Sequence, residues 1–320
     1  MKNNNLILVL LAAIAAAVMT ASAAVSPNAA VLLALLSPLP LYVSGFMAGP
    51  IAALLSGLGA SVLLWLGFSA GAGIQFFLYS GLAPILLSHL CLRHRPIGDG
   101  PTLEGEVREQ GQEWYPEGRL LAWGAGLCFM LMSGRYYLAD GASMQDAMRA
   151  LLYSAFQSEL EIVDEATRQN FQEFANRLAR LTPALGAHSM VLSLFVNFRL
   201  AAMISKMSGK ALRPWAAISA MVIPREANYA LAIFTALALV PGEIGNLGQL
   251  GLACVFAAFA MGGLAIVHRF IDQMSAGPVL YFVLYLSLSL FYPLVALVLA
   301  VLALVDPYLN LRKNLNFPKE

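Results

Sequence analysis

The stretch from Gln249 to Val267, QLGLACVFAAFAMGGLAIV, decides the class of fold, because it runs for 19 residues without a charged side chain. A helix of about 20 apolar residues crosses the hydrocarbon core of a bilayer, which is about 30 Å thick. Inside that core every backbone N–H and C=O must be paired within the chain, which makes an α-helix the default. This stretch therefore predicts a transmembrane helix.

Further apolar runs predict an all-α, polytopic transmembrane bundle of about eight or nine segments, with the lipid bilayer as a partner. The composition agrees, because 59% of the 320 residues are hydrophobic and 12% are charged, whereas a soluble domain is about half apolar and a quarter charged. The other runs cover residues 6–25, 29–47, 51–69, 71–91, 120–138, 183–205, 227–241 and 278–304.

The positions of charged residues divide the chain into parts. Basic residues near span ends favour the cytoplasmic side, which places residues 92–119 and 206–225 in the cytoplasm. Residues 139–182 carry seven acids against four arginines and are expected outside. We therefore expect four transmembrane helices in residues 1–91, a flexible cytoplasmic loop rich in glycine, proline and acids at 92–119, and a second transmembrane group at 120–320.

The number of spans conflicts with the charge of the C-terminal tail. Nine single passes from a cytoplasmic N-terminus would place Arg312 and Lys313 outside, against the preference of basic residues. We expect residues 278–304 to break at Pro293 and turn back as a hairpin or a re-entrant pair. A non-spanning or cleaved first segment would repair the count equally well, since the small residues at 20–24 resemble a signal cleavage site.

The expected external segment, residues 139–182, predicts two amphipathic helices. Apolar side chains recur at three- and four-residue steps from Met144 to Leu181, with a break between Ser158 and Asp164. The polar face is acidic, which favours a cap packed over the bundle rather than adhesion to anionic lipid.

Polar side chains inside spans are candidate ligand-binding residues. Arg135 and Tyr136, near the outer end of a span, belong either to an interfacial aromatic belt or to the mouth of a site for an anionic ligand. Asn197 and Arg199 are candidates near the cytoplasmic end of another span, although Arg199 is equally suited to snorkelling toward water.

Proline and glycine interrupt the apolar helix between Pro38 and Pro50. Interrupted helices at membrane depth are typical of cavity edges, so Tyr42, Gly49 and Pro50 are further ligand-binding candidates, together with Gln75. Simple kinks and a tight turn between spans are the alternative.

Small residues in the first run form two overlapping Ala-x-x-x-Ala pairs, Ala12 with Ala16 and Ala13 with Ala17. Small residues let helices approach closely in lipid. The pairs therefore indicate either ordinary packing within the chain or a docking face for a partner membrane protein.

The sequence argues against several chemical functions. A net charge of +1 gives no attraction to polyanions, so nucleic acid is not an expected partner. Phosphate-loop, His-Glu-x-x-His and nucleophile–histidine–acid patterns are missing from the sequence, so we expect neither an enzyme nor a cofactor. His89, Cys91 and His94 lack a fourth ligand, so no metal is expected.

The C-terminal half resembles the YybS-like family of bacterial membrane proteins. The residues that carry the resemblance are VNFRLAAMISKMSGKALRPW (196–215), LAIVH (264–268) and LVDPYLNLR (304–312). The family is distantly similar to the substrate-binding (S) components of energy-coupling-factor transporters. The resemblance implies a multi-pass protein of the bacterial inner membrane.

That resemblance implies a subunit that binds a vitamin or micronutrient and docks a coupling protein and an ATPase module through the alanine pairs of its first helix. It also implies a ligand pocket beside the Gly49–Pro50 turn. The alternative is a scaffold or assembly factor that binds protein partners. A cavity of several hundred cubic ångströms between spans would favour the first function, and a solid bundle the second.

Overall fold

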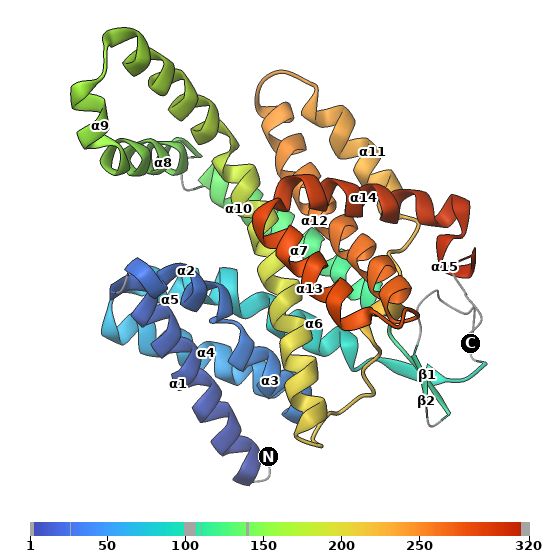
Figure 1. Ribbon diagram of the computed structural model, residues 1–320. Helices are drawn as coiled ribbons and strands as arrows, with labels where there is room; N and C mark the ends of the chain where they lie inside the picture. The colour runs from blue at the N-terminus through green and yellow to red at the C-terminus, as the bar shows by residue number, and fades with distance from the viewer. Residues whose placement is uncertain (1–2, 26, 99–106, 110, 139–140, 315–320) are drawn as a thin grey trace.

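The computed structural model describes residues 3–25, 27–98, 107–109, 111–138 and 141–314, and most of them are helical. The N-terminal helices are α1 (Asn3–Val25), α2 (Pro27–Leu36), α3 (Leu39–Ala48), α4 (Pro50–Gly67), α5 (Ala70–Phe76), the π-helical turn η1 (Phe77–Gly81) and α6 (Leu82–Cys91). The C-terminal helices are α7 (Glu117–Leu138), α8 (Gly141–Ala155), α9 (Gln157–Ile162), α10 (Glu165–Met207), the 3₁₀ turn η2 (Ile218–Ala220), α11 (Ala227–Ala238), α12 (Glu243–Ile271), α13 (Gly277–Leu290), α14 (Tyr292–Leu309) and α15 (Leu311–Asn314). The long helix α10 runs between the two groups (Figure 1).

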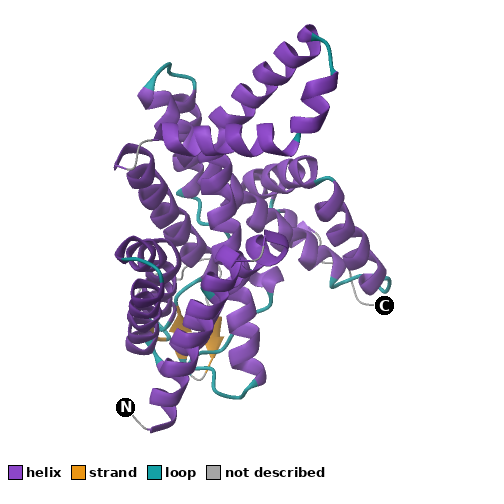
Figure 2. Cartoon of the chain, turned by 90° about the vertical axis from the view of Figure 1, so that its left-hand side faces the viewer, coloured by secondary structure: helices purple, strands orange, loops and turns teal. Residues whose placement is uncertain are grey.

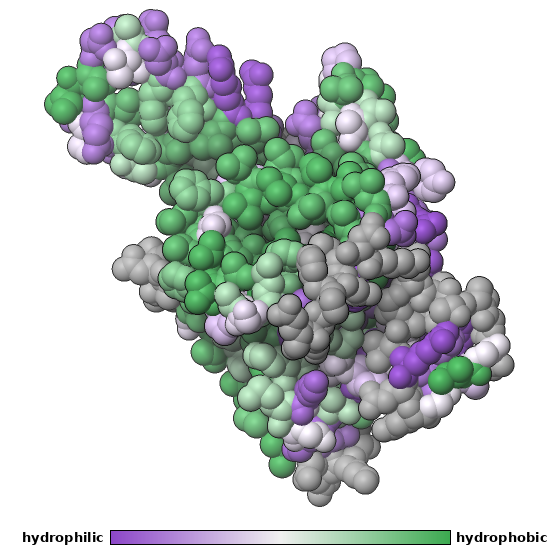
Figure 3. Space-filling model, turned by 45° about the vertical axis from the view of Figure 1, so that its right-hand side comes forward, coloured by the Kyte–Doolittle hydropathy of each residue, from purple (hydrophilic) through white to green (hydrophobic). Residues whose placement is uncertain are grey.

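In the part of the chain that the structure describes, six helical segments are long and apolar enough to cross a membrane, which confirms the predicted helical membrane protein but not its eight or nine segments. They are Asn5–Ala23, Pro50–Gly67, Ala70–Cys91, Glu165–Met207, Glu243–Ile271 and Tyr292–Leu309. Figure 3 shows apolar side chains gathered over the middle of the molecule, with hydrophilic side chains around the far end of α8 and α9.

Helix α12, which contains the apolar residues 249–267, is the central helix of the C-terminal group. In its most apolar window 72% of the residues are buried, against 28 to 44% in the other five segments. A Cβ atom on Gly263 would lie 1.8 Å from the backbone oxygen of Leu299 in α14, so glycine is required for this close approach.

The run predicted at 29–47 forms two half-length helices, α2 and α3. The chain breaks at Ser37 and Pro38, where proline cannot donate a hydrogen bond to the preceding turn. Helix α10 supplies donors to the Leu35 carbonyl at this break: the Asn197 side-chain amide at 2.6 Å and the Ser193 hydroxyl at 2.8 Å. Irregular backbone at membrane depth is stable when the surrounding protein pairs it in this way.

The run predicted at 278–304 is likewise divided into two helices. Helix α13 ends at Leu290 and α14 begins at Tyr292, with Phe291 between them in a non-helical conformation (φ −128°, ψ 39°). Pro293 lies in the first turn of α14, where its missing N–H costs nothing. The expected break at Pro293 is therefore present.

Helices α8 and α9 and the first half of α10 form an arm that projects from the bundle (Figure 1). Arg149 of α8 donates to the Asn176 side chain of α10 at 3.0 Å, and the ring of Tyr153 lies 5.4 Å from that of Phe171. The predicted break is present between Ile162 and Glu165. The arm is paired with itself and contacts the bundle at its base, through Met144, so the structure does not show the expected packed cap.

Residues 92–119 contain a small sheet, which differs from the expected flexible loop. Strands β1 (His94–Pro96) and β2 (Val107–Glu109) both pair antiparallel with β3 (Gln112–Trp114). Glu113 stabilises the sheet, because its buried carboxylate binds Arg95 and Arg108, each at 2.8 Å. Figure 2 shows the sheet at the same end of the molecule as the N-terminus. Residues 99–106 and 110 of this segment lie outside the described part of the chain.

Candidate functional site

A cavity of about 370 Å³ lies between α3, α6, α7 and α10, beside the base of the arm. Small-molecule sites occupy clefts of about 300 Å³ or more and commonly lie between the helices of bundles. The lining residues are Ala34, Leu35, Pro38, Tyr42, Tyr79, Ser80, Ala83, Cys128, Met132, Arg135, Met144, Gly186, Ser189, Met190, Ser193 and Leu194. Most of the wall is apolar, and a few polar groups are set into it.

Tyr42, on the same face of α3 as Pro38, forms the deep end of the cavity. Its side chain is fully buried beside the rings of Phe46 and Phe198, at 5.7 and 6.1 Å. Its hydroxyl has no hydrogen-bond partner among the residues that the structure describes. An unpaired buried hydroxyl costs about 1–3 kcal/mol, so a molecule in the cavity that accepts this hydrogen bond gains stability.

Arg135 lies at the exposed mouth of the same cavity. Spacings of four and three residues place Cys128, Met132 and Arg135 on one face of α7. The guanidinium carbon of Arg135 lies 5.5 Å from the centre of the Tyr79 ring. Tyr79 belongs to η1, a π-helical turn of the kind that is frequent at functional sites. The π-helical turn therefore places an aromatic ring and a cation together at the cavity mouth.

An aromatic cluster joins α3 and α10 to the segment 208–226 that follows α10. The rings of Phe46 and Trp215 lie 4.6 Å apart, and that of Phe198 lies 5.1 and 5.5 Å from them. The Trp215 indole donates to the Ser205 hydroxyl at 3.1 Å. The cluster packs against the ring of Tyr42, which lines the cavity.

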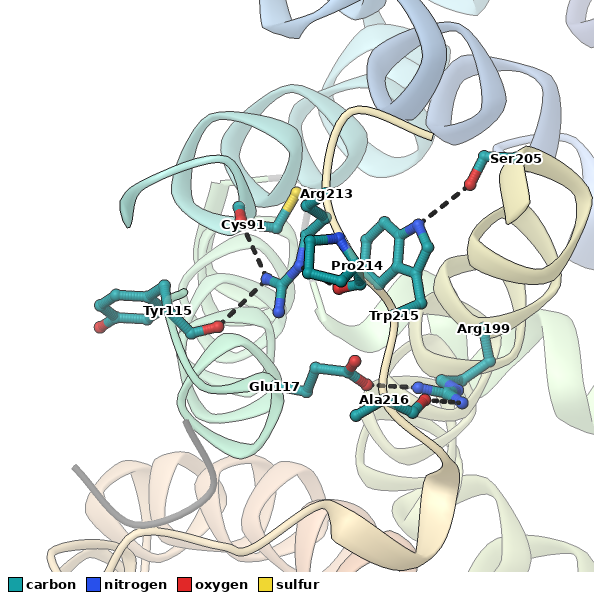
Figure 4. A network of polar contacts seen from close by, with 9 residues as sticks. All are labelled: Cys91, Tyr115, Glu117, Arg199, Ser205, Arg213, Pro214, Trp215 and Ala216. Carbon is teal, nitrogen blue, oxygen red and sulfur yellow. Dashed lines mark hydrogen bonds and ion pairs between the residues drawn. The ribbon is translucent and has the colours of Figure 1, made fainter. Parts of the chain in front are cut away.

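A buried polar network lies next to the aromatic cluster (Figure 4). Arg199 forms an ion pair with Glu117, whose side chain is 4% exposed, and donates to the Ala216 carbonyl at 3.1 Å. Arg199 therefore faces into the protein, and the snorkelling interpretation is wrong because a buried carboxylate compensates its charge.

Arg213 anchors the segment 208–226 within this network. It is 3% exposed, donates to the carbonyls of Cys91 and Tyr115 at 2.9 and 3.1 Å, and stacks on Trp215 with its guanidinium carbon 4.9 Å from the ring centre. Burial lowers the pKa of the Arg213 guanidinium from its ordinary value, but arginine keeps its charge in proteins. Arg213 thereby joins the ends of α6 and α7 to the segment after α10.

Comparison with known proteins identifies the family. Residues 118–307 match a family described as predicted membrane protein (DUF2232). The chain belongs to this family. No curated protein and no solved structure matches it. The comparisons support neither the YybS-like name nor the similarity to S components.

The segment that matches the DUF2232 family contains only part of the cavity. The walls of the cavity formed by α7 and α10, which include Arg135 and Gly186, lie inside the matched residues. Tyr42 and Tyr79, which also line the cavity, precede the matched residues. The central helix α12 lies wholly within the match. The cavity is therefore built jointly by the family segment and the N-terminal helices.

The structure brings only some of the predicted ligand-binding residues to the cavity. Tyr42 and Arg135 line it, and Asn197 lies behind its wall, where it pairs the Leu35 carbonyl. Gly49, at φ 94°, and Pro50 form the tight turn between α3 and α4 and do not line the cavity.

Gln75 and Tyr136 also lie away from the cavity lining. Gln75 is exposed on α5. The Tyr136 hydroxyl accepts a hydrogen bond from the Asn246 side chain at 2.9 Å and so joins α7 to α12.

The alanine pairs of α1 are buried within the chain. Ala12, Ala13, Ala16 and Ala17 are 0 to 7% exposed. A Cβ atom on Gly59 of α4 would lie 3.1 Å from that of Ala13, which shows how closely the two helices approach. These alanines serve packing between α1 and its neighbours, and docking of a partner through them stays a prediction.

Several residues of the site had no clear signal in the sequence. Tyr79 and Ser80 form a polar pair in an apolar run, which is the one local hint of the π-helical turn. Met144 extends from the arm to line the cavity. Glu117 forms an ion pair with Arg199, which lies 82 residues away in the sequence. Periodicity does not report such long-range contacts.

Proposed function

We propose that this chain is a small-molecule-binding subunit of the bacterial inner membrane, and that its cavity holds the ligand. The observation that carries the proposal is a cavity of about 370 Å³ with the unpaired Tyr42 hydroxyl at its deep end. A scaffold would need no such cavity. The volume therefore favours ligand binding over the scaffold or assembly function.

The other cavities are less suited to a small ligand. The cavity of about 250 Å³ between α12 and α14 contains Arg312, which is already paired with Asp306 at 2.7 Å. The groove of about 290 Å³ between α4 and α5 is lined almost wholly by apolar side chains, which suits lipid. A larger space of about 630 Å³ lies on the projecting arm, away from the bundle.

The proposal includes a topology of ten crossings with both termini in the cytoplasm. The α13–α14 break adds one crossing to the nine predicted runs, which removes the conflict with the basic C-terminal tail. The N-terminus and the sheet lie at the end opposite to the arm (Figure 1).

A thiol reagent that cannot cross membranes tests this topology. It should label Ser275→Cys from the cytoplasmic face and Phe291→Cys from the outer face. Labelling of both from one face would refute the hairpin.

We further propose that the bound molecule is transported with the help of a separate ATPase module. The position of the cavity supports this step, because its mouth is exposed near the arm and its buried Tyr42 lies beside Phe46 and Phe198. A coupling protein and its ATPase are then the partners. Failure of both to co-purify with the chain from its native membrane would count against this step.

A thermal-shift screen of vitamins and similar micronutrients on the detergent-solubilised chain tests ligand binding. At least one compound should raise the melting temperature of the wild-type protein. The matched control is Gly186→Leu, because Gly186 lines the cavity next to Met132 and a leucine there fills it. Equal shifts in both proteins, or no shift in a folded wild-type sample, would contradict the proposal.

A further inference from the structure

The charges around the cavity narrow the class of molecule that it takes, an inference that rests on the proposed function. Arg135 is the cation among the lining residues, and the lining set of the described chain includes no aspartate or glutamate. Among the described residues, Arg135 contacts the face of the Tyr79 ring, which leaves its N–H groups, at the edge of the guanidinium plane, available to an acceptor. A cation at the mouth of an apolar cavity, with no carboxylate among the described lining residues, favours an anionic ligand.

A second polar group, the hydroxyl of Tyr42, lies at the deep end of the cavity, opposite Arg135. Cys128, fully buried like Tyr42, precedes Arg135 by seven residues on α7, a distance of about 10 Å along the helix axis. The unpaired hydroxyl of Tyr42 is at this deep end. Between the two ends the wall is formed by Met132, Met190 and Leu194, whose side chains adapt to an apolar body.

We infer that the cavity binds a small organic anion with a single carboxylate or comparable oxyanion group. The anionic group is bound by Arg135 at the mouth, the apolar body lies between the methionines, and an acceptor atom at the far end takes the hydrogen bond of Tyr42. Arg135 sets the charge preference, and Tyr42 contributes equally to charged and neutral ligands.

The test uses pairs of ligands that differ in charge and little else. The probes are biotin with biotinamide, nicotinate with nicotinamide, lipoate with lipoamide, and pantothenate with pantothenol. Binding to the full chain in phosphatidylcholine nanodiscs is measured by calorimetry for the wild type, Arg135→Gln and Arg135→Lys. Arg177→Gln is the matched control, because Arg177 is a 79% exposed arginine of the arm that does not line the cavity.

The expected result is that at least one acid binds about tenfold or more tightly than its neutral counterpart. Arg135→Gln removes this preference with little effect on the neutral compound, Arg135→Lys keeps part of it, and Arg177→Gln changes nothing. Equal binding of acid and neutral compound, or an unchanged preference in Arg135→Gln, overturns the anion inference and leaves the proposed function standing.

Two further outcomes overturn the inference differently. If no compound of any pair binds to folded wild-type protein, both this inference and the proposed function fail. If acid binding disappears when phosphatidylglycerol is added to the nanodiscs, a lipid headgroup is the anion that occupies the site, and the soluble ligand is excluded.

Discussion

The buried hydroxyl of Tyr42 has no hydrogen-bond partner among the described residues, and phenylalanine would fill the same space without leaving a donor unpaired. We predict that Tyr42→Phe raises the stability of the empty protein by about 1 kcal/mol and weakens ligand binding. Thermal denaturation with and without ligand measures both effects. Tyr79→Phe, at the cavity mouth, serves as the control. A less stable Tyr42→Phe protein would show that the hydroxyl has a structural partner.

Arg199 and Glu117 form the second residue-scale feature, a buried ion pair. Breaking such a pair leaves an uncompensated charge, so Arg199→Met should lower the free energy of unfolding by about 3–5 kcal/mol. Adding Glu117→Leu removes the orphaned carboxylate, so the double variant should recover much of that loss. Chemical denaturation in detergent measures both proteins. A double variant less stable than Arg199→Met would contradict a purely structural role for the pair.

Helix α10 shows what a single element contributes, because its 43 residues, about 65 Å in length, extend well beyond a hydrocarbon core of about 30 Å. Its outer half belongs to the arm and its inner half to the cavity wall. The helix begins at an N-cap, where the Asp164 carboxylate accepts a hydrogen bond from the Thr167 backbone N–H at 3.0 Å. Hydrogen bonding to the Thr167 side chain, together with that from its backbone N–H, lowers the pKa of Asp164 below its ordinary 3.8.

The pH dependence of this cap follows from the direction of the shift. A lowered pKa means that the carboxylate stabilises the helix start fully above pH 3.8 and that this effect is lost as the pH falls through the lower, folded-state pKa. Amide hydrogen exchange at residues 165–168 should therefore lose protection on acidification. Asp164→Asn keeps a capping side chain that does not titrate in this range and should show a smaller loss. Equal losses in both proteins would rule out Asp164 as the cause.

The elements differ in how far the sequence predicted them. The run at 249–267 predicted the central helix, because uninterrupted apolarity is a strong local signal. The breaks at Pro38 and Pro293 were also predictable, since proline acts on its own helix. The sheet at 94–114 was not, because its stability depends on one buried glutamate, Glu113, shared by arginines of two other strands.

At the scale of the whole molecule, the cavity depends on contacts that no local pattern contains. Tyr42 and Arg135 were both candidate residues, but their meeting in one cavity requires α3, α7 and α10 to pack together, and Met144 to arrive from the arm. Gly49 and Pro50 were misleading because a tight turn and a cavity edge need the same residue types. Composition established the membrane class, and the site required the tertiary structure.

The most direct test of the cavity is the reactivity of a cysteine placed in its wall. Ser80→Cys is introduced into a chain in which Cys91, Cys128 and Cys254 are alanine, and the comparison protein keeps only the fully buried Cys254, which does not line the cavity. In membranes, a small water-soluble thiol reagent should modify Ser80→Cys rapidly, more slowly when Gly186→Leu is added, and should leave Cys254 unmodified. Equal, negligible modification of both cysteines would show that the bundle is solid, and would contradict a ligand-binding function.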